Sequence, residues 1–166
     1  MIYLLYFVIV GALVGADQAL KAWTTAHLAV GQSAPLLPGV MQLTRLHNTG
    51  AAWSSFAGKT ALLVAVTALL LAAVAWLLVS RRVRHPLGAA ACLLIFGGGV
   101  GNIIDRVANG YVVDMFDLLL FDYPIFNLAD CFVVVGVILG AIYYLFLYEK
   151  TDKKETGHDV SADGDK

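Results

Sequence analysis

Side chains able to do acid–base chemistry are concentrated between Gly97 and Asp130, a stretch that begins in one apolar segment and ends in another. An ionisable group at the centre of a membrane span costs roughly 2.5–3.5 kcal/mol on insertion scales. The stretch nevertheless holds five of the 12 Asp and Glu residues of the chain. We therefore expect its aspartates to serve a function. They are Asp105, Asp114, Asp117, Asp122 and Asp130.

Asp114 and Asp130 are the pair best suited to acid–base catalysis. Asp130 follows Asn127 by three residues, so the two share a helical face at the start of an apolar segment. Two carboxylates about 4 Å apart repel each other by roughly 4 kcal/mol at an effective dielectric constant of 20. That repulsion keeps one proton on the pair near neutral pH. One carboxylate then takes a proton from water while the other polarises a carbonyl group.

Other roles for these aspartates remain open on composition alone. Asp114 and Asp130 would also suit a buried ion pair or a structural hydrogen bond. Asp117 lies three residues after Asp114, and spacing does not choose between them. The alternative for Asp117 and Asp122 is that both are solvated loop residues.

Asn102 and Arg106 are four residues apart and share a face at the end of the third apolar segment. Arg106 could donate a fork of hydrogen bonds to a carbonyl or carboxylate group. Its alternative is to snorkel to the membrane interface, paired with Asp105.

Two further polar sites precede this stretch. Asp17 and Lys21 form an i, i+4 pair, which suits a structural role as well as a catalytic one. Asn48, in H-N-T-G-A-A-W-S-S-F, could bind an extended peptide or form a turn.

The elements that must position these residues are membrane spans. The chain has 166 residues, 60% hydrophobic and 14% charged, whereas soluble domains carry about 25% charged residues. About 20 residues cross a 30 Å hydrocarbon core. We therefore expect an all-α membrane protein with four transmembrane helices, at about 2–22, 60–79, 87–104 and 127–148. The first could instead be a cleavable signal peptide, although no Lys or Arg precedes it.

Charge distribution predicts how these spans are oriented. Residues 80–86 read S-R-R-V-R-H-P, and three arginines in a short loop indicate the cytoplasmic side. The polar tail at 149–166 is expected to be disordered and cytoplasmic. Segments 23–58 and 105–126 then share the opposite face, which gathers the polar residues at one membrane boundary.

Local patterns add two expectations. Residues 40–46 alternate and predict a short strand in a small extracytoplasmic β-element, after a turn within 28–37. Pairs of glycines four apart, at 11 and 15, 97 and 101, and 136 and 140, favour close helix packing.

Several classes of site are not indicated. The two cysteines, Cys92 and Cys131, lie in different spans and the histidines are scattered, so we expect no metal and no cofactor. No basic stripe interleaved with aromatics suggests a nucleic-acid partner.

Five sequence blocks, taken in order, resemble the bacterial lipoprotein signal peptidases, or signal peptidase II, over about residues 1–148. They are D-Q-A-L-K (17–21), N-T-G-A-A-W-S (48–54), G-N-I-I-D-R (101–106), V-V-D-M-F-D (112–117) and F-N-L-A-D (126–130). Met115 and Cys131 stand where the family often has other residues, and neither change removes a functional group.

The resemblance implies a single peptidase domain at 1–148 and a function for it. That function is a membrane aspartic endopeptidase that removes the signal peptide from diacylglyceryl-modified prolipoproteins, just before the lipidated cysteine, and is blocked by globomycin. Asp114 and Asp130 would be catalytic. The resemblance assigns substrate binding to Asn48, Asn102, Arg106 and Asn127, and a supporting role to Asp17, Lys21 and Asp105.

Two competing functions remain to be tested. Intramembrane carboxylates also serve proton relays, but a proton-coupled protein needs a polar track across the membrane, and the inner halves of these spans lack charges. A structural membrane subunit would use the carboxylates only in ion pairs. We expect a monomer in the bacterial cytoplasmic (inner) membrane, in contact with lipid, with its active site at the extracytoplasmic face.

Overall fold

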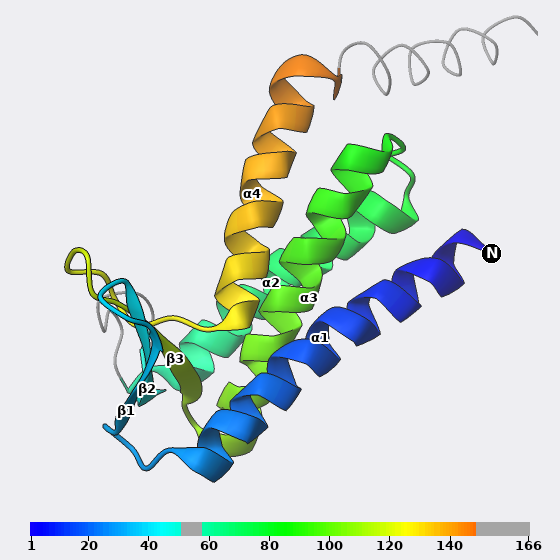
Figure 1. Ribbon diagram of the computed structural model, residues 1–166. Coiled ribbons are helices and arrows are strands. Elements are labelled where there is room, and N and C mark those ends of the chain that lie inside the picture. The colour runs from blue at the N-terminus through cyan, green and yellow to red at the C-terminus, as the bar shows by residue number, and fades with distance from the viewer. Residues whose placement is uncertain (51–57, 149–166) are drawn as a thin grey trace, which may run out of the picture.

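The computed structural model describes residues 1–50 and 58–148 (Figure 1). The tail at 149–166, predicted to be disordered, lies outside the described residues. The elements in chain order are α1 (Ile2–His27), β1 (Ser33–Leu37), β2 (Met41–Asn48), α2 (Thr60–Val79), α3 (Pro86–Asn109), β3 (Val112–Leu118) and α4 (Leu128–Phe146). Within this part of the chain, four helices are long and apolar enough to cross a membrane. The predicted fold class is confirmed.

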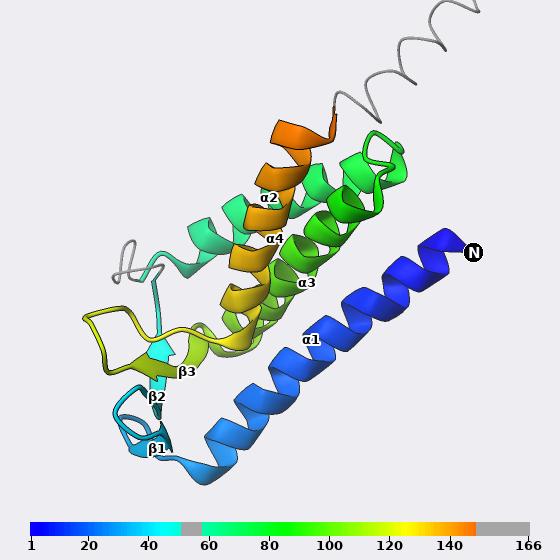
Figure 2. The same ribbon diagram turned by 45° about the horizontal axis from the view of Figure 1, so that its top comes forward.

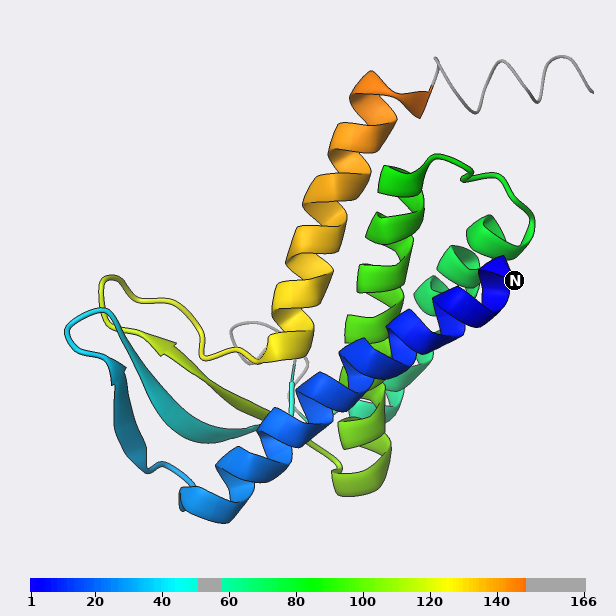
Figure 3. The same cartoon turned by 45° about the vertical axis from the view of Figure 1, so that its right-hand side comes forward.

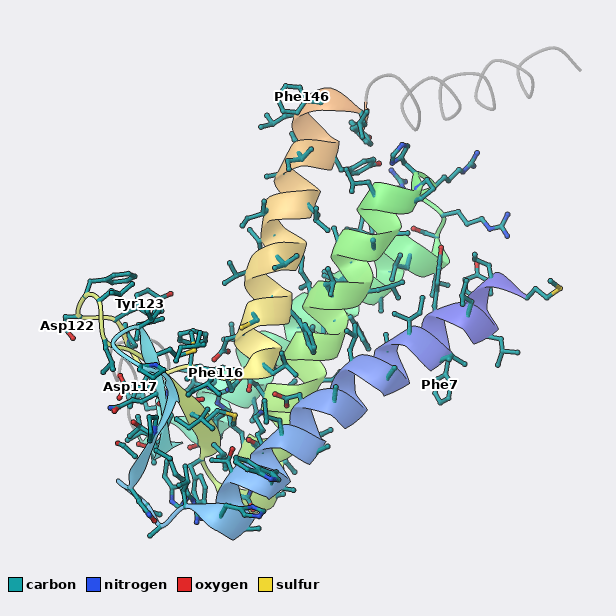
Figure 4. All side chains as sticks on the ribbon, viewed as in Figure 1. Phe7, Phe116, Asp117, Asp122, Tyr123 and Phe146 are labelled. Atoms are coloured by element: carbon teal, nitrogen blue, oxygen red, sulfur yellow. The ribbon has the colours of Figure 1, made fainter. Side chains whose placement is uncertain are left out.

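α3 is the central helix, and the other three pack around it (Figures 1 and 3). Of the residues in its most apolar stretch, 56% are buried, against 6%, 11% and 17% for α1, α2 and α4. The outward faces of the other helices carry large apolar side chains. Figure 4 shows Phe7 and Phe146 pointing away from the bundle, and Phe7 is 77% exposed. Such surfaces suit contact with lipid.

Three successive glycines explain how α3 accommodates three neighbours. A Cβ on Gly97 would lie 2.9 Å from the Leu13 side chain of α1, and one on Gly99 would lie 2.6 Å from Leu71 of α2. A Cβ on Gly98 would collide with the backbone of Ala129 in α4. Consecutive helical residues point about 100° apart, so one G-G-G run faces three helices.

The other two glycine pairs were also predicted to mark close helix packing, and only one of them does so. Gly136 of α4 packs closely on α3, where a Cβ would lie 2.9 Å from the Ala91 carbonyl oxygen. Gly11 and Gly15 of α1 have no neighbour within 4 Å, so the spacing there does not mark a helix contact.

Two helices extend beyond their predicted ends. α1 continues to His27, and α3 continues to Asn109, where Gly110 takes the left-handed conformation (φ 82°) and its N–H donates to the Arg106 carbonyl. Asp105 therefore lies inside α3 rather than at its end, and it can face α1.

The sheet is antiparallel, in the order β1-β2-β3. The strand predicted at 40–46 corresponds to β2, and the turn predicted within 28–37 is present at Val30 and Gly31, followed by β1, which was not predicted. β3 was not predicted, so Asp114 and Asp117 lie in a strand and not in a loop. V-V-D-M-F-D-L does not alternate because the residues at 112–115 are all buried, at 6% exposure or less.

The sheet lies beside the C-terminal end of α1 and the first turn of α4 (Figures 1 and 2). A cluster of Leu28, Leu43, Val113 and Met115 anchors it, and the Thr24 hydroxyl contacts the Met115 sulfur at 3.6 Å. The chain after β3 returns to pair with it at Phe126, immediately before α4. This return brings the β3 aspartate and the α4 aspartate to one place.

Candidate active site

A pocket of about 240 Å³ lies where β3, the end of α3 and the start of α4 meet. Its lining combines six polar side chains with an apolar wall. The lining residues are Asn48, Asn102, Arg106, Val112, Asp114, Tyr123, Pro124, Ile125, Phe126, Asn127, Asp130, Val133 and Val134.

Asp114 enters the pocket from β3 and is 1% exposed. Its two carboxyl oxygens accept hydrogen bonds from the side-chain amides of Asn48, at 2.8 Å, and Asn127, at 2.7 Å. Burial raises the pKa of Asp114 to about 7, and the charge of Asp130 adds to this shift. The two amide hydrogen bonds and the charge of Lys21 lower the pKa but do not offset burial.

Asp130 is fixed by the start of α4. Asn127 is the N-cap: its side-chain oxygen accepts from the Asp130 N–H at 2.9 Å, and Asp130 Oδ2 accepts from the Asn127 N–H at 3.1 Å. This reciprocal capping box satisfies two backbone donors at the helix start. Asp130 Oδ1 accepts from the Asn102 amide at 2.8 Å. The positive end of the helix dipole favours negative charge at this position.

Two asparagine side chains connect the aspartates. Asn127 Nδ2 donates to Asp114 Oδ1 and also to Asn102 Oδ1, at 3.1 Å, while Asn102 Nδ2 donates to Asp130 Oδ1. A continuous line of hydrogen bonds therefore runs from Asp114 through Asn127 and Asn102 to Asp130. Sequence spacing could not show that Asp114 and Asp130 lie together. In the structure both line one pocket.

A cluster of buried charged side chains lies beside this line of hydrogen bonds and holds Asn102 in position. Lys21 Nζ lies 2.8 Å from Asp17 Oδ2, 3.1 Å from Asp105 Oδ2 and 3.0 Å from Asn102 Oδ1. Asp17 also accepts from the backbone N–H of Ala129 in α4, at 2.9 Å. The cluster thus connects α1, α3 and α4, and orients the Asn102 amide toward Asp130.

Gln18 completes this cluster and was not predicted. Its amide donates to Asp105 Oδ1 at 3.0 Å, to Asp17 Oδ2 at 3.2 Å and to the Gly101 carbonyl at 3.2 Å. The D-Q-A-L-K block places Gln18 beside Asp17, but spacing gave no reason to select it. Asp105 Oδ2 also accepts from the Val113 N–H at 3.0 Å, which ties β3 to α3.

Arg106 closes one side of the pocket. Its guanidinium donates to the Gly50 carbonyl at 3.0 Å and to the Asn102 carbonyl at 3.5 Å. Of its two predicted roles, donation to a backbone carbonyl is the one observed, since Asp105 pairs with Lys21 instead. Arg106 thereby holds the chain that follows Asn48 against α3.

The rival aspartates lie outside the pocket. Asp117 accepts hydrogen bonds from Gln42 and Thr44 of β2, both at 2.8 Å. Asp122 is exposed in the loop after β3 (Figure 4). Asp117 is therefore a hydrogen-bonded strand residue rather than the solvated loop residue expected, and Asp122 is the solvated loop residue expected.

The apolar wall of the pocket was not predicted either. It comes from residues 123–126 of the return segment and from Val133 and Val134 of α4. Y-P-I-F carries no motif that distinguishes a pocket wall from an ordinary membrane-side loop. The pairing of Phe126 with β3 brings this segment to the pocket that contains the aspartates.

Comparison with known proteins identifies the family. A family model described as "Signal peptidase (SPase) II", peptidase family A8, matches residues 9–146. The chain belongs to the signal peptidase II family. Among its relatives, the lipoprotein signal peptidase of Enterococcus faecalis is 40% identical over 149 residues, covering 90% of this chain and 92% of that protein. That of Clostridium acetobutylicum is 41% identical over 150 residues, covering 89% and 96%.

Solved structures agree with this family assignment. A bacterial membrane enzyme determined by the in meso method at 1.9 Å resolution superposes on this chain with a TM-score of 0.79 at 33% identity. The match covers 86% of this chain and 93% of that one. Signal peptidase II enzymes are aspartic-type peptidases, so the proton-coupled and purely structural alternatives are set aside for this multi-pass bacterial membrane protein.

Proposed function

We propose that Asp114 and Asp130 are the catalytic dyad of this signal peptidase II, which cleaves signal peptides from prolipoproteins. The observation that carries the proposal is the line of hydrogen bonds from Asp114 through Asn127 and Asn102 to Asp130, inside one pocket. Both carboxyl groups are oriented by amide donors on rigid elements. Such fixed geometry is what general acid–base catalysis requires.

The dyad works with one shared proton, and we propose that Asp114 delivers it to the substrate while Asp130 acts as the base. With its pKa near 7, Asp114 is largely protonated below neutral pH. Asp130 carries the negative charge, which the start of α4 and the Asn102 amide stabilise. The pair titrates as a unit, so its proton moves between the two residues during turnover.

Hydrolysis then follows a balanced sequence. Asp130 takes a proton from water as the water oxygen attacks the scissile carbonyl carbon, and Asp114 gives its proton to the carbonyl oxygen. The resulting gem-diol collapses when Asp130 returns its proton to the amide nitrogen and the C–N bond breaks. A gem-diol hydroxyl gives its proton back to Asp114. The products are a carboxylic acid and an amine, and the dyad is restored.

Substrate binding is assigned to the polar groups around the dyad. The relatives are lipoprotein signal peptidases, which supports a prolipoprotein substrate. We propose that it carries a diacylglyceryl group and is cut just before the lipidated cysteine. Asn48, Asn102, Arg106 and Asn127 contact the peptide, while Asp17, Lys21 and Asp105 support them. The apolar wall beside Val133 and Val134 gives the lipid chains a path from the bilayer.

The positive charge of one loop indicates how the protein is oriented in the membrane. The arginine-rich loop at 80–86 lies at the end of the bundle opposite the sheet (Figure 1). Since such loops stay in the cytoplasm, the pocket faces the extracytoplasmic side of the inner membrane. The bundle encloses the pocket with residues of one chain, so we propose that a monomer is active.

The test is cleavage of a synthetic, diacylglyceryl-modified precursor peptide by the purified protein. Asp114→Asn and Asp130→Asn should each lower kcat by about 10²–10⁴-fold while the protein stays folded, because each removes one acid–base group. Asp117→Asn is the matched control: it changes the other β3 aspartate, which accepts hydrogen bonds from Gln42 and Thr44 of β2 and does not line the pocket. Near-normal cleavage by either dyad variant would refute the assignment. Globomycin should block the wild-type reaction.

A further inference from the structure

An apolar groove separates α1 from α2 at the end of the bundle far from the active site. Both helices pack on α3 but scarcely on each other. The groove has a volume of about 230 Å³ and no polar surface. Its walls include Phe7 and Val10 of α1 and Ala75 of α2, with Phe96 of α3 at its floor. From Tyr3 to Val10 it follows α1 for about 10 Å, at 1.5 Å per residue.

A basic pocket of about 330 Å³ adjoins the groove. Tyr3, Tyr6 and Leu78 line both, so the two spaces are direct neighbours. The basic pocket adds Arg81 and Arg84 from the loop between α2 and α3. The Tyr3 hydroxyl donates to the Val79 carbonyl at 3.3 Å and holds the end of α1 against that of α2.

Arg81 occupies a backbone position that usually belongs to glycine. α2 ends in a Schellman motif: the Arg82 N–H donates to the Leu77 carbonyl at 3.1 Å, and the Arg81 N–H to the Leu78 carbonyl at 3.3 Å. Arg81 takes the left-handed conformation, with φ of 54°, and is the one non-glycine residue with positive φ in the described ranges 1–50 and 58–148. Glycine takes this conformation without steric cost. Replacing Arg81 by glycine would therefore remove the side chain without straining the backbone.

We propose that this groove and pocket form a binding site for an anionic phospholipid. The phosphate of the headgroup lies between the guanidinium groups of Arg81 and Arg84, and one acyl chain fills the groove between α1 and α2. Guanidinium forks match phosphate oxygens, and basic pockets between membrane helices bind anionic headgroups. The loop is cytoplasmic by its charge, so the lipid comes from the inner leaflet.

Two features favour a lipid over a free anion. The basic pocket adjoins a groove that is lined by apolar side chains and bordered by Phe7, an exposed side chain of α1. Tyrosines at its mouth are the side chains that membrane proteins place at the headgroup level. Two arginines facing one pocket also favour an anionic headgroup over a zwitterionic one.

The test titrates phosphatidylglycerol and phosphatidylcholine separately into the purified full-length protein in detergent and measures binding by native mass spectrometry. Wild-type protein should prefer phosphatidylglycerol. The double variant Arg81→Gly/Arg84→Gln should lose about thirtyfold in affinity for it, or about 2 kcal/mol at about 1 kcal/mol per basic residue. Arg81→Gly suits the local backbone, so the fold is kept.

Matched controls come from the same elements. Arg82→Gln removes an equal charge from the same loop, but Arg82 lies over the Trp76 ring, at 5.3 Å, and does not line the pocket. It should leave the lipid preference intact. Ala75→Phe fills the groove and should weaken binding of both lipids, whereas Ala73→Phe, exposed elsewhere on α2, should not.

Three results would overturn the proposal. One is equal affinity of the wild-type protein for the two lipids. A second is a loss from Arg82→Gln as large as that from the double variant, since that indicates diffuse attraction. The third is displacement of phosphatidylglycerol by inorganic phosphate as readily as by more phosphatidylglycerol, since that indicates a free-anion site.

Discussion

The carboxyl group of Asp114 receives a hydrogen bond on each oxygen, yet burial still raises its pKa to about 7. Under the acid role proposed for Asp114, this balance between burial and hydrogen bonding sets the pH range of the reaction. The acid role proposed for Asp114 needs its proton, so turnover depends on how firmly the surroundings hold it.

The first prediction concerns the pH profile of kcat/KM, which reports the pKa values of the free enzyme. The alkaline limb should fall with an apparent pKa near 7, as Asp114 loses its proton. Asn48→Ala should move this limb to higher pH, because the Asn48 amide lowers the pKa of Asp114. Gln42→Ala removes a donor from the same strand that bonds to Asp117 instead, and should leave the limb in place. If the alkaline limb of the pH profile stays in place in Asn48→Ala, the acid role assigned to Asp114 is wrong.

The second prediction concerns stability. A carboxyl group whose pKa is raised on folding binds more protons in the folded state than in the unfolded state. Its stabilising contribution to the free energy of unfolding is therefore fully present below about pH 4 and is lost as the pH rises through 7. Between pH 5 and pH 7 this costs about 2 kcal/mol, because the slope of about 1.36 kcal/mol per pH unit falls to half when the pH reaches the folded-state pKa. The melting temperature of Asp114→Asn relative to wild type should therefore rise across this range. A constant difference would mean that Asp114 does not hold a proton.

At the scale of elements, the site depends on how α1, α3 and α4 are joined. Lys21 forms ion pairs with two buried carboxylates that belong to different helices. Removing one member of a buried charge cluster leaves the others unpaired, which typically costs 3–5 kcal/mol.

The third prediction follows from that cluster. Lys21→Met should lower the melting temperature strongly and reduce kcat, because Asn102 loses the donor that orients its amide. Lys59→Met, at the exposed start of α2, removes the same charge and should change neither. Thermal unfolding and peptide cleavage measure the two effects. An equal loss in both variants would show that the buried position of Lys21 is unimportant.

The fourth prediction concerns the contact between α3 and α4. Gly98→Ala would place a methyl group against the Ala129 backbone, next to Asp130, and overpacking of this kind costs about 1–3 kcal/mol. Both melting temperature and cleavage should fall. Gly11→Ala, with no neighbour within 4 Å, should be close to neutral. If the two variants behave alike, α3 and α4 are not closely packed at this point.

The elements differ in how well the sequence predicts them. The helices follow from their apolar length, and β2 follows from its alternation. β1 and β3 do not, because their pairing with β2 joins residues distant in the chain, and β3 is buried without alternation. For the same reason the resemblance to the family could name Asp114 and Asp130, while spacing could not show that Asn127 and Asn102 connect them.

At the scale of the whole molecule, charge lies at the two ends of an apolar bundle. The charged side chains that are buried in the described part of the chain, Asp17, Lys21, Asp105 and Asp114, all belong to the end that carries the sheet. The loop after α2, which carries three arginines, lies at the other end (Figure 3). The apolar middle of the bundle is what the bilayer must cover.

The fifth prediction tests this orientation. In a background of Cys92→Ala and Cys131→Ala, a single Asp122→Cys should react with a membrane-impermeant maleimide in intact cells. A single Ser80→Cys should react only after permeabilisation, since its loop is cytoplasmic by charge. The opposite labelling pattern would place the active site inside the cell.

Asp130 serves the helix start and the pocket with the same carboxyl group. Because Asp130 has these two roles, few substitutions at this position should give resistance to an antibiotic that binds in the pocket. A substitution of Asp130 that weakened binding of the drug would also remove a hydrogen-bonding partner from the first turn of α4. The resistant enzyme would therefore lose folding stability as well as activity. Compounds aimed at Asp130 and Asn127 should therefore select resistance more slowly than compounds aimed at the apolar wall.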